Sequence, residues 1–461
     1  MKKDTCSKIP IVVGMFLVGT FLFGFNCKAV GKSKREKKRD AILENIKAPK
    51  ISNYTISILD FGAKGDSVTD CKPAFEKAFA QAKAKRGARI IIPAGIYSMQ
   101  GPLHLVSNIC IDLQKGARLK FSSNPDNYLP AVFTSWEGTF LYNYSPLIYG
   151  YKLENVSIVG QGTLDGNAAE TFSKWRDLQN KDQQLSRDMN HKQIPIKDRL
   201  FGKGTYLRPH FIQLFECENI LIEGVTITNS PFWCVHLLKS ENATVRGVNF
   251  IAKNINNDGV DPEYSKNILI ENINFDNGDD NVAIKSGRDT EGRATAVPSE
   301  NIIIRNCKFK GLHGVVVGSE MSAGVRNVFV ENCTTGGYLK RGIFLKSNPD
   351  RGGFIRDIYV NNVNFGEVED CFFITSFYHG EGAGYATDIH NVYVENVTCG
   401  RARNAGIVIQ GFPSKPVTDI FFKNVTIDST KVGLSLTNTD RIIMSNVNIG
   451  GVINAMPSYA K

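Results

Sequence analysis

Short runs in which apolar and polar residues alternate recur along most of the chain. Units in which apolar residues stand one and three positions after an Asn begin at Asn219, Asn242 and Asn267, and turns rich in Asn and Gly follow them. Such short alternating runs predict β-strands with one buried face. Further units begin at Asn301, Asn327, Asp357, Asn391, Asp419 and Arg441. Successive units start 22 to 34 residues apart, a period that is typical of solenoid proteins.

Strands of this kind, with no hairpin turn between them, are best stacked in parallel, one coil upon the next. The expected fold class is therefore all-β, with residues 54–461 forming a single-domain parallel β-helix of about ten coils. The segment 165–208 departs from this pattern because it is polar and rich in Lys, Arg, Asp and Gln. A buried core cannot have this composition, so we expect an inserted loop or lid over one face.

One amphipathic helix is expected before the repeats, over residues 70–86. Asp70 is a suitable N-cap and Pro73 suits the first turn, while small and aromatic apolar residues recur at helical spacing. Gly87 ends the helix. A helix with a single apolar face must cover something, and we expect it to cap the open N-terminal end of the stack.

The N-terminal segment is typical of a targeting sequence. A basic start is followed by an uncharged apolar run over residues 9–25 and by small residues near Ala29. We interpret residues 1–29 as a signal peptide, because the run is shorter than the roughly 20 residues of a spanning helix. The protein is then secreted or periplasmic, with an outer-membrane lipoprotein anchored through Cys27 as an alternative. Residues 30–53 are expected to form a polar, basic tether.

Net charge and cysteine spacing exclude several classes of function. The formal charge of +10 arises mainly from the first 40 residues, and beyond them 45 basic residues face 42 acidic ones. So small an excess does not indicate a nucleic-acid partner. No two cysteines form a C-x-x-C pair, which makes a zinc site unexpected. We interpret most cysteines of the folded part as buried free thiols, and one or two disulfides stay open.

The stretch 256–287 carries the candidate chemistry. It contains Asp258 and Asp261, followed by the adjacent pair Asp279 and Asp280. Asp258 and Asp279 are 21 residues apart, close to the length of one coil. They should occupy nearly the same place on consecutive coils, about 4.8 Å apart. Asp280 would point to the opposite side unless a turn intervenes.

The next coils add an imidazole and two cations to this column. His313 follows its unit's Asn301 by the same distance that separates Asp279 from Asn267, which places it one coil further on. Lys346 and the nearby Arg341 should lie one coil beyond His313. Carboxylates lined up in this way suit glycoside hydrolysis, in which one protonated and one ionised carboxyl act on the same bond. Crowded like charges help to keep one of them protonated.

Two other interpretations of the acidic residues stay open. The aspartates could simply accept hydrogen bonds from turn amides, as single Asp residues in such repeats often do. Alternatively, Asp276, Asp279 and Asp280 could bind calcium.

In combination, these motifs resemble glycoside hydrolase family 28, the pectin-degrading polygalacturonase family. The resembling motifs are Asn256-Asn257-Asp258, Gly278-Asp279-Asp280, the segment 282–287, Leu312-His313-Gly314 and the segment 229–233. The resemblance implies a right-handed β-helix and a hydrolase that needs no metal or other cofactor. It also implies that the partner is an acidic plant cell-wall polysaccharide or oligosaccharide, with no nucleic acid, and we expect a monomer.

The same resemblance implies roles for individual residues. Asp279 would be the general acid, and Asp258 and Asp280 together would activate water, with inversion at the anomeric carbon. The supporting and substrate-binding residues would be Asn256, His313, Lys346 and Tyr378.

One departure from the family's pattern concerns the substrate. The family's Arg-Ile-Lys, whose arginine grips a galacturonate carboxylate, is Phe344-Leu345-Lys346 here. Phenylalanine cannot bind a carboxylate as arginine does, so Arg341 or Arg351 would have to substitute unless Phe344 is a platform for rhamnose. Three activities follow as candidates: a polygalacturonase, exo-acting if 165–208 blocks the groove; a rhamnogalacturonan hydrolase; and a calcium-dependent lyase. A non-catalytic glycan-binding β-helix is the remaining alternative.

Overall fold

The computed structural model describes residues 32–379, 382–450 and 452–456. The predicted signal peptide, residues 1–29, and its Cys27 lie outside the described residues. Within the described part of the chain, no helix is both long and apolar enough to cross a membrane.

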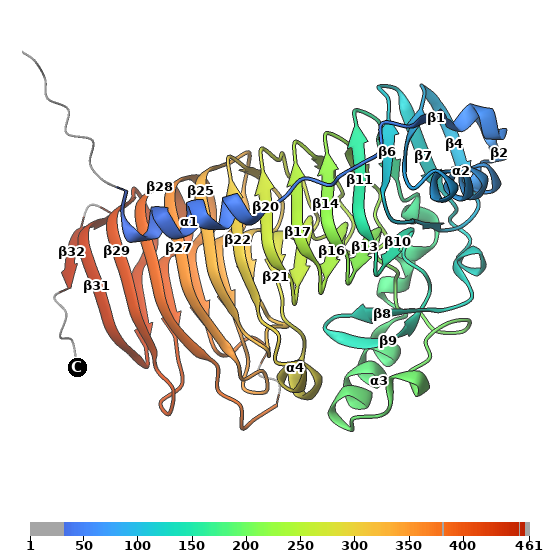
Figure 1. Ribbon diagram of the computed structural model, residues 1–461. Coiled ribbons are helices and arrows are strands. Elements are labelled where there is room, and N and C mark those ends of the chain that lie inside the picture. Colours follow the sequence, from blue (N-terminus) through green and yellow to red (C-terminus); the bar gives the residue numbers. More distant parts are fainter. Residues whose placement is uncertain (1–31, 380–381, 451, 457–461) are drawn as a thin grey trace, which may run out of the picture.

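The strands stack in parallel into one long solenoid (Figure 1), which confirms the predicted β-helix. One face consists of β5 (Leu103–His104), β10 (Ile148–Tyr151), β13 (Ile212–Phe215), β16 (Val235–Leu238), β19 (Val260–Glu263), β21 (Asp280–Ile284), β24 (His313–Val317) and β26 (Leu339–Lys346), with β30 (Thr430–Thr437) further along. We call this the site face, because its central strands carry the aspartates.

Two further faces complete each coil. The second consists of β1 (Thr55–Ser57), β3 (Ala88–Ile92), β6 (Ile109–Leu113), β11 (Glu154–Gly160), β14 (Glu218–Glu223), β17 (Glu241–Arg246), β20 (Lys266–Glu271), β22 (Ser299–Arg305), β25 (Val325–Thr335), β29 (Val417–Ile427) and β31 (Thr439–Ile449), with β32 (Val452–Met456) antiparallel at the end. The third consists of β2 (Asp66–Asp70), β4 (Gly95–Met99), β7 (Ala117–Phe121), β12 (Thr163–Asp165), β15 (Thr226–Thr228), β18 (Asn249–Ile251) and β23 (Lys308–Phe309). The long strands β27 (Phe354–Thr375) and β28 (Asp388–Gln410) continue round the corners between faces.

The asparagine that opens each repeat has a structural explanation. Asn267, Asn301 and Asn327 all adopt a left-handed backbone conformation, with φ of 58°, which asparagine tolerates better than most residues. Their side chains stack along the solenoid: Asn301 Nδ2 donates to Asn267 Oδ1 at 3.1 Å, and Asn327 Nδ2 donates to Asn301 Oδ1 at 3.0 Å. The repeat therefore marks a corner of the coil, and the isoleucines after it fill the core.

The N-terminal cap is present as predicted, although it is slightly shorter. Helix α2 (Lys72–Ala84) buries Phe75, Phe79 and three alanines against the first coils (Figure 1). The residue at the N-cap position is Cys71 rather than Asp70. The Asp70 carboxylate still accepts a hydrogen bond from the Lys72 amide at 3.0 Å.

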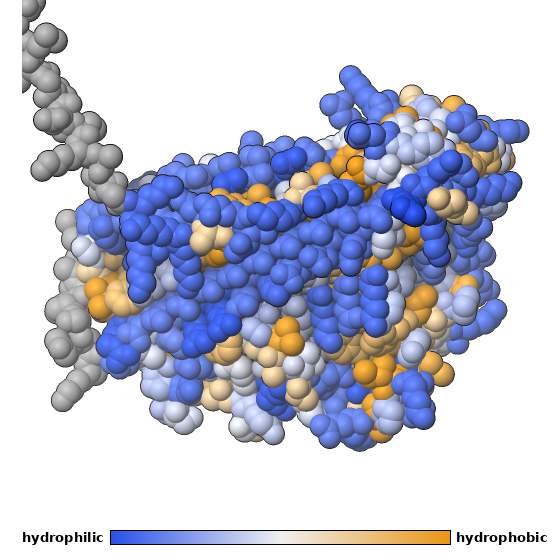
Figure 2. Space-filling model, viewed as in Figure 1, coloured by the Kyte–Doolittle hydropathy of each residue, from blue (hydrophilic) through white to orange (hydrophobic). Residues whose placement is uncertain are grey.

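The predicted tether, residues 30–53, contains a helix that the sequence analysis missed. Helix α1 (Lys34–Asn45) lies across the second face, which is largely hydrophilic in this view (Figures 1 and 2). Ile42 packs on Phe329 and its neighbours, and Arg39 pairs with Glu331 at 3.1 Å. The helix was missed because its sequence is dominated by lysine and arginine, which are typical of a solvated linker, and few of its residues are apolar.

The insertion 165–208 does cover one side of the solenoid, but much of it is helical. It contains the short helices η3 (Ala168–Glu170), η4 (Phe172–Arg176) and η5 (Ile196–Asp198) and the longer α3 (Asn180–His191). A β-hairpin, β8 (Val132–Trp136) and β9 (Thr139–Asn143), supports α3 beside helix α4 (Asp289–Thr295) (Figure 1). All eight cysteines in the described chain are free and buried, as expected for core thiols.

Candidate active site

A polar pocket of about 220 Å³ opens between the site face and the insertion. From the coils it is lined by Trp233, Asn256, Asp258, Asp279, Asp280, Lys285, Arg288, Ser319, Glu320, Lys346, Arg351, Tyr378 and His379. From the hairpin and the insertion it is lined by Glu137, Arg176, Gln179, Gln183 and Arg187. The second group forms one side of the pocket, and we call it the pocket wall.

The backbone brings the aspartates together with a register that differs by one residue from the prediction. Strands β19 and β21 pair Val260 with Val282, so Asp258 is level with Asp280 rather than with Asp279. His313 likewise pairs with Asp280. Asp279 precedes the strand, where Gly278 approaches the backbone so closely that a Cβ would lie 2.1 Å from the Asn254 carbonyl oxygen. The bend there lets both neighbouring aspartates reach the pocket.

Asp279 lies beside two other carboxyl groups and accepts a hydrogen bond from Asn256. Asn256 Nδ2 donates to Asp279 Oδ2 at 3.2 Å, and the buried Arg208 holds Asn256 in turn by donating to its Oδ1 at 2.6 Å. Burial, together with the charges of Asp258 and Asp280, raises the pKa of Asp279 well above its usual value. Asp279 is therefore suited to donate a proton near neutral pH.

Asp280 has the opposite character. His313 Nδ1 lies 2.6 Å from its Oδ1, and Lys346 Nζ donates to its Oδ2 at 3.1 Å. Burial alone would raise the pKa of Asp280, but Lys346 and His313 outweigh burial and hold that pKa well below its usual value. Asp280 therefore stays ionised, although His313 itself does not line the pocket.

A buried cation organises the remaining carboxylates. Lys285 Nζ lies 3.7 Å from Asp258, 3.7 Å from Asp261 and 3.3 Å from Glu320. Burial and the charge of Asp261 raise the pKa of Asp258 well above its usual value, while Lys285 opposes that rise. Asp258 Oδ1 has no hydrogen-bond partner in the described chain, so it can accept a bond from a water or a sugar hydroxyl.

These contacts place a proton donor and an ionised carboxylate on adjacent residues. Asp279 can protonate a leaving oxygen, Asp280 can deprotonate a water, and Asp258 beside it can orient that water by a hydrogen bond. The pocket unites Asp258, Asp279, Asp280, Asn256, Lys346 and Tyr378 from the predicted set.

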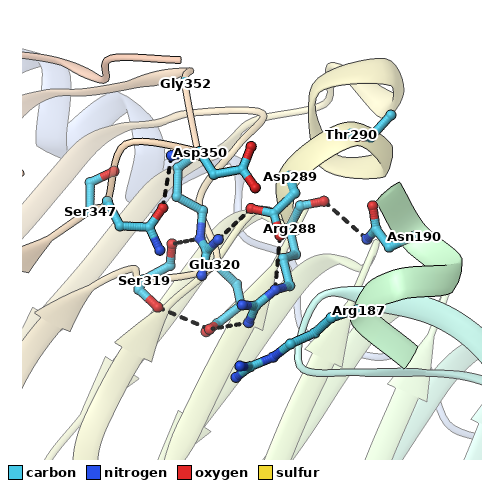
Figure 3. Close-up of polar contacts among 12 residues, drawn as sticks. Arg187, Asn190, Arg288, Asp289, Thr290, Ser319, Glu320, Ser347, Asp350 and Gly352 are labelled. Carbon is cyan, nitrogen blue, oxygen red and sulfur yellow. Dashed lines mark hydrogen bonds and ion pairs between the residues drawn. The ribbon is translucent and has the colours of Figure 1, made fainter. Parts of the chain in front are cut away.

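Arg341 and Arg351, the predicted substitutes for the missing arginine, already pair with carboxylates of the protein. Arg341 lies 3.3 Å from Asp370, its guanidinium carbon is 4.4 Å from the centre of the Phe344 ring, and it is not among the described residues that line the pocket. Arg351 is buried and bonded to Asp289 and to the Ser319 carbonyl oxygen. Figure 3 shows the surrounding network, in which the neighbouring Arg288 also binds Asp289.

The surroundings of Phe344 do not support an open platform for rhamnose. Phe344 does not point into the core of the solenoid but packs outside it with Ala283, Val316 and Phe373. It is only 1% exposed, because Arg341 covers it, so it cannot serve as an open platform for a sugar.

Sequence reasoning expected the insertion 165–208 over one face, but it missed Arg208, Lys285 and the individual residues of the pocket wall. Lys285 follows the buried run 282–284, and a charge at that place needs a partner, which was a usable signal. Arg208 carried no such signal, because it ends the insertion and its partner Gln179 lies 29 residues before it.

The calcium site predicted as an alternative is not assembled as proposed. Asp276 lies apart, bound to Lys253 and, at 3.1 Å, to Lys310. Ligand atoms of Asp279, Asp280 and His313 do lie within 4.8 Å of one another. The ammonium of Lys346 already occupies one side of this group, which disfavours a second cation.

Comparison with known proteins agrees with this geometry. The family model for glycosyl hydrolases family 28 matches residues 89–447, and a model described as rhamnogalacturonase A/epimerase, pectate lyase-like, matches residues 55–114. A probable polygalacturonase from Vitis vinifera is 29% identical over 86% of this chain and 79% of its own length. An exo-poly-alpha-D-galacturonosidase from Dickeya chrysanthemi is 27% identical over 87% of this chain and 70% of its own length.

A solved structure extends the likeness to the whole fold. The crystal structure of a hyperthermoactive exopolygalacturonase from Thermotoga maritima has a TM-score of 0.87 and 37% identity, covering 92% of this chain and 97% of that one. The family match spans most of the chain and includes every aspartate of the site. The protein is therefore a polygalacturonase-type glycoside hydrolase and belongs to glycosyl hydrolases family 28.

Proposed function

We propose that this enzyme hydrolyses galacturonate chains from one end, with inversion, and that Asp279 acts as the acid while Asp280 and Asp258 activate water. The pairing of a raised pKa at Asp279 with a lowered one at Asp280 supports this division of roles. The excess of cationic side chains around the pocket suits an acidic pectic substrate. Secretion, predicted from residues 1–29, would bring the enzyme to the plant cell wall.

The pocket wall is the main structural support for the proposal of exo action. Helix α3 contributes Gln183 and Arg187, and both contact Glu137 of the hairpin, with Gln183 donating at 2.8 Å. Asn190 on the same helix is fully buried and donates to the Arg288 carbonyl oxygen at 3.2 Å (Figure 3). A wall fixed by such contacts would stop a polymer from passing through, so only a chain end would enter.

Product analysis tests exo action. Polygalacturonate and rhamnogalacturonan are incubated side by side, and the products of the first minutes are separated by anion-exchange chromatography. We expect only galacturonate monomer or dimer from polygalacturonate, and little product from rhamnogalacturonan because Phe344 is covered. Mixed longer oligomers at early times would contradict exo action, and faster cleavage of rhamnogalacturonan would contradict the substrate.

Chelation should leave the activity unchanged. We expect EDTA treatment followed by dialysis to alter kcat by less than about twofold, because Lys346 and His313 already neutralise Asp280 and no step needs a second cation. The same samples are followed by ultraviolet absorbance, which reports the unsaturated product of a lyase. Loss of activity with EDTA together with such absorbance would favour the lyase alternative instead.

A further inference from the structure

We propose that Arg176 is the specificity residue that binds a galacturonate carboxylate at the walled end of the pocket. This rests on the proposed function, and it assigns to the insertion the task that Phe344 cannot perform. In chemical terms, the ligand is the carboxylate of the sugar at the chain end, bound by two parallel hydrogen bonds to the guanidinium.

Arg176 is the pocket cation that lacks a protein partner. Lys346 pairs with Asp280, and Lys285 lies among three carboxylates. Arg187 and Arg288 approach Glu137 at 3.4 and 4.0 Å. Arg351 binds Asp289. The side chain of Arg176 has no hydrogen bond, ion pair or ring contact within the described chain.

The backbone that carries Arg176 is nevertheless firmly anchored. It ends helix η4, whose Phe172 and Trp175 are buried in the main core. The Trp175 ring packs on Tyr144 and Tyr206, with centroids 5.2 and 5.4 Å apart. A half-buried arginine without a partner on a rigid turn is preorganised for a ligand, because binding costs little backbone entropy.

The charge balance of the pocket points the same way. Six cationic side chains and five carboxyl groups line it, so the cations outnumber the carboxylates even when every carboxyl is ionised. No carboxylate of the described chain pairs with Arg176. A carboxylate from the substrate would complete this balance, whereas a neutral sugar would leave the guanidinium unpaired.

The position of Arg176 also fits the sugar at the end of the substrate chain rather than the leaving sugar. Gln179, three residues further along the chain, binds Arg208, which in turn donates to Asn256 beside Asp279. Arg176 and Gln179 belong to the insertion, whereas Lys346 and Tyr378 belong to later coils. Arg176 would thus bind a carboxylate on the insertion side of the pocket, while Lys346 holds Asp280.

The test uses Arg176→Gln, with Lys174→Gln as the matched control. Lys174 lies in the same η4 helix, but its ammonium is exposed and pairs with Glu170 at 3.5 Å. Both variants lose one positive charge, so they share any long-range effect. Substrates are tri-galacturonate and its fully methyl-esterified form, and KM and kcat are measured for each, with the melting temperature as a check of folding.

We expect Arg176→Gln to raise KM for tri-galacturonate by about 10- to 100-fold, with a smaller change in kcat. Its kcat/KM for the ester should match that of the unmodified enzyme, and Lys174→Gln should behave normally on both. Arg176→Lys should recover part of the loss, because it keeps the charge without the paired bonds. An unchanged KM for Arg176→Gln, or an equal loss on acid and ester, would overturn the proposal.

The two possible failures can be told apart. If the unmodified enzyme hydrolyses tri-galacturonate but Arg176→Gln is normal, only the role of Arg176 is wrong. If the unmodified enzyme releases no galacturonate, the proposed function itself fails. Calorimetric binding of tri-galacturonate to Asp279→Asn, with and without Arg176→Gln, then shows whether Arg176 still binds the acid; equal affinities would overturn the proposal in that case too.

Discussion

Asp279→Asn is expected to lower kcat by about 10²- to 10⁴-fold while the fold stays intact. Asparagine has nearly the same shape as aspartate, but it cannot donate the proton that the leaving oxygen needs. Asn256 can still donate to the new side-chain oxygen, so the geometry around position 279 should persist. The measurement is kcat on tri-galacturonate, together with the melting temperature.

The acid assignment also predicts a dependence on the leaving group. A substrate with a good leaving group, such as an aryl galacturonide, needs little protonation, so Asp279→Asn should lose much less activity on it. Asp276→Asn is the control, because Asp276 is an aspartate outside the pocket, bound to surface lysines. Normal turnover of tri-galacturonate by Asp279→Asn would refute the assignment.

Lys285→Met should produce the largest loss of stability among the site variants. The ammonium of Lys285 is buried among Asp258, Asp261 and Glu320. The side chain of methionine is similar in length to that of lysine, so the substitution removes the charge and keeps most of the packing. Removing one partner of a buried ionic group leaves uncompensated charge and typically costs about 3–5 kcal/mol. The measurement is the free energy of unfolding in urea near neutral pH.

The loss should depend on pH in a defined direction. Without Lys285, the pKa values of Asp258 and Asp261 rise even further above those of the unfolded chain, which lie near 3.9. Acids with a raised folded pKa keep their stability below the unfolded value and lose it as pH rises toward the folded value. The variant should therefore be closest to the unmodified enzyme at about pH 4 and furthest from it at about pH 8.

Lys253→Met provides the control for this experiment. Lys253 is more than half exposed and pairs with Asp276 on the surface, where such pairs contribute about 0–1 kcal/mol. A small change for Lys285→Met, equal to that of Lys253→Met and independent of pH, would show that the buried cluster is not held by Lys285.

The repeats made the fold predictable because each coil has the same structural requirements. Every unit needs a corner that asparagine can form and inward-facing residues that fill one shared core. The regular spacing of these units in the sequence therefore predicts the stacked coils of the whole solenoid. The acids were predictable for the same reason, since a coil length places Asp258 near Asp279 and Asp280. The one-residue error in register arose at the bend of Gly278, which no period reveals.

The pocket wall could not be predicted in the same way. Helix α3 has no repeat, and its anchor is the polar residue Asn190, which is buried only because Thr139 and Arg288 offer it partners. Helix α1 was missed for a related reason, because charged residues occupy most positions of its sequence and leave no clear apolar face. In both cases the contacts that fix the segment come from distant parts of the chain.

The short distance between Asp279 and Asp280 makes the anomeric configuration of the product a useful test of the mechanism. Ligand atoms of Asp279 and Asp280 lie within 4.8 Å, closer than the roughly 6.5–9.5 Å between the carboxyls of most inverting glycosidases. Distance alone would favour a covalent route. Against that route, both oxygens of Asp280 are held by His313 and Lys346, and bonds of this kind reduce its power as a nucleophile.

The anomeric form of the first product tests the central claim most directly. Hydrolysis of α-linked tri-galacturonate is followed by proton NMR from the first seconds, before mutarotation mixes the anomers. Direct attack by a water that Asp280 and Asp258 activate predicts that the β-anomer appears first and the α-anomer only later. Initial release of the α-anomer would contradict the inverting mechanism and make Asp280 or Asp258 a nucleophile.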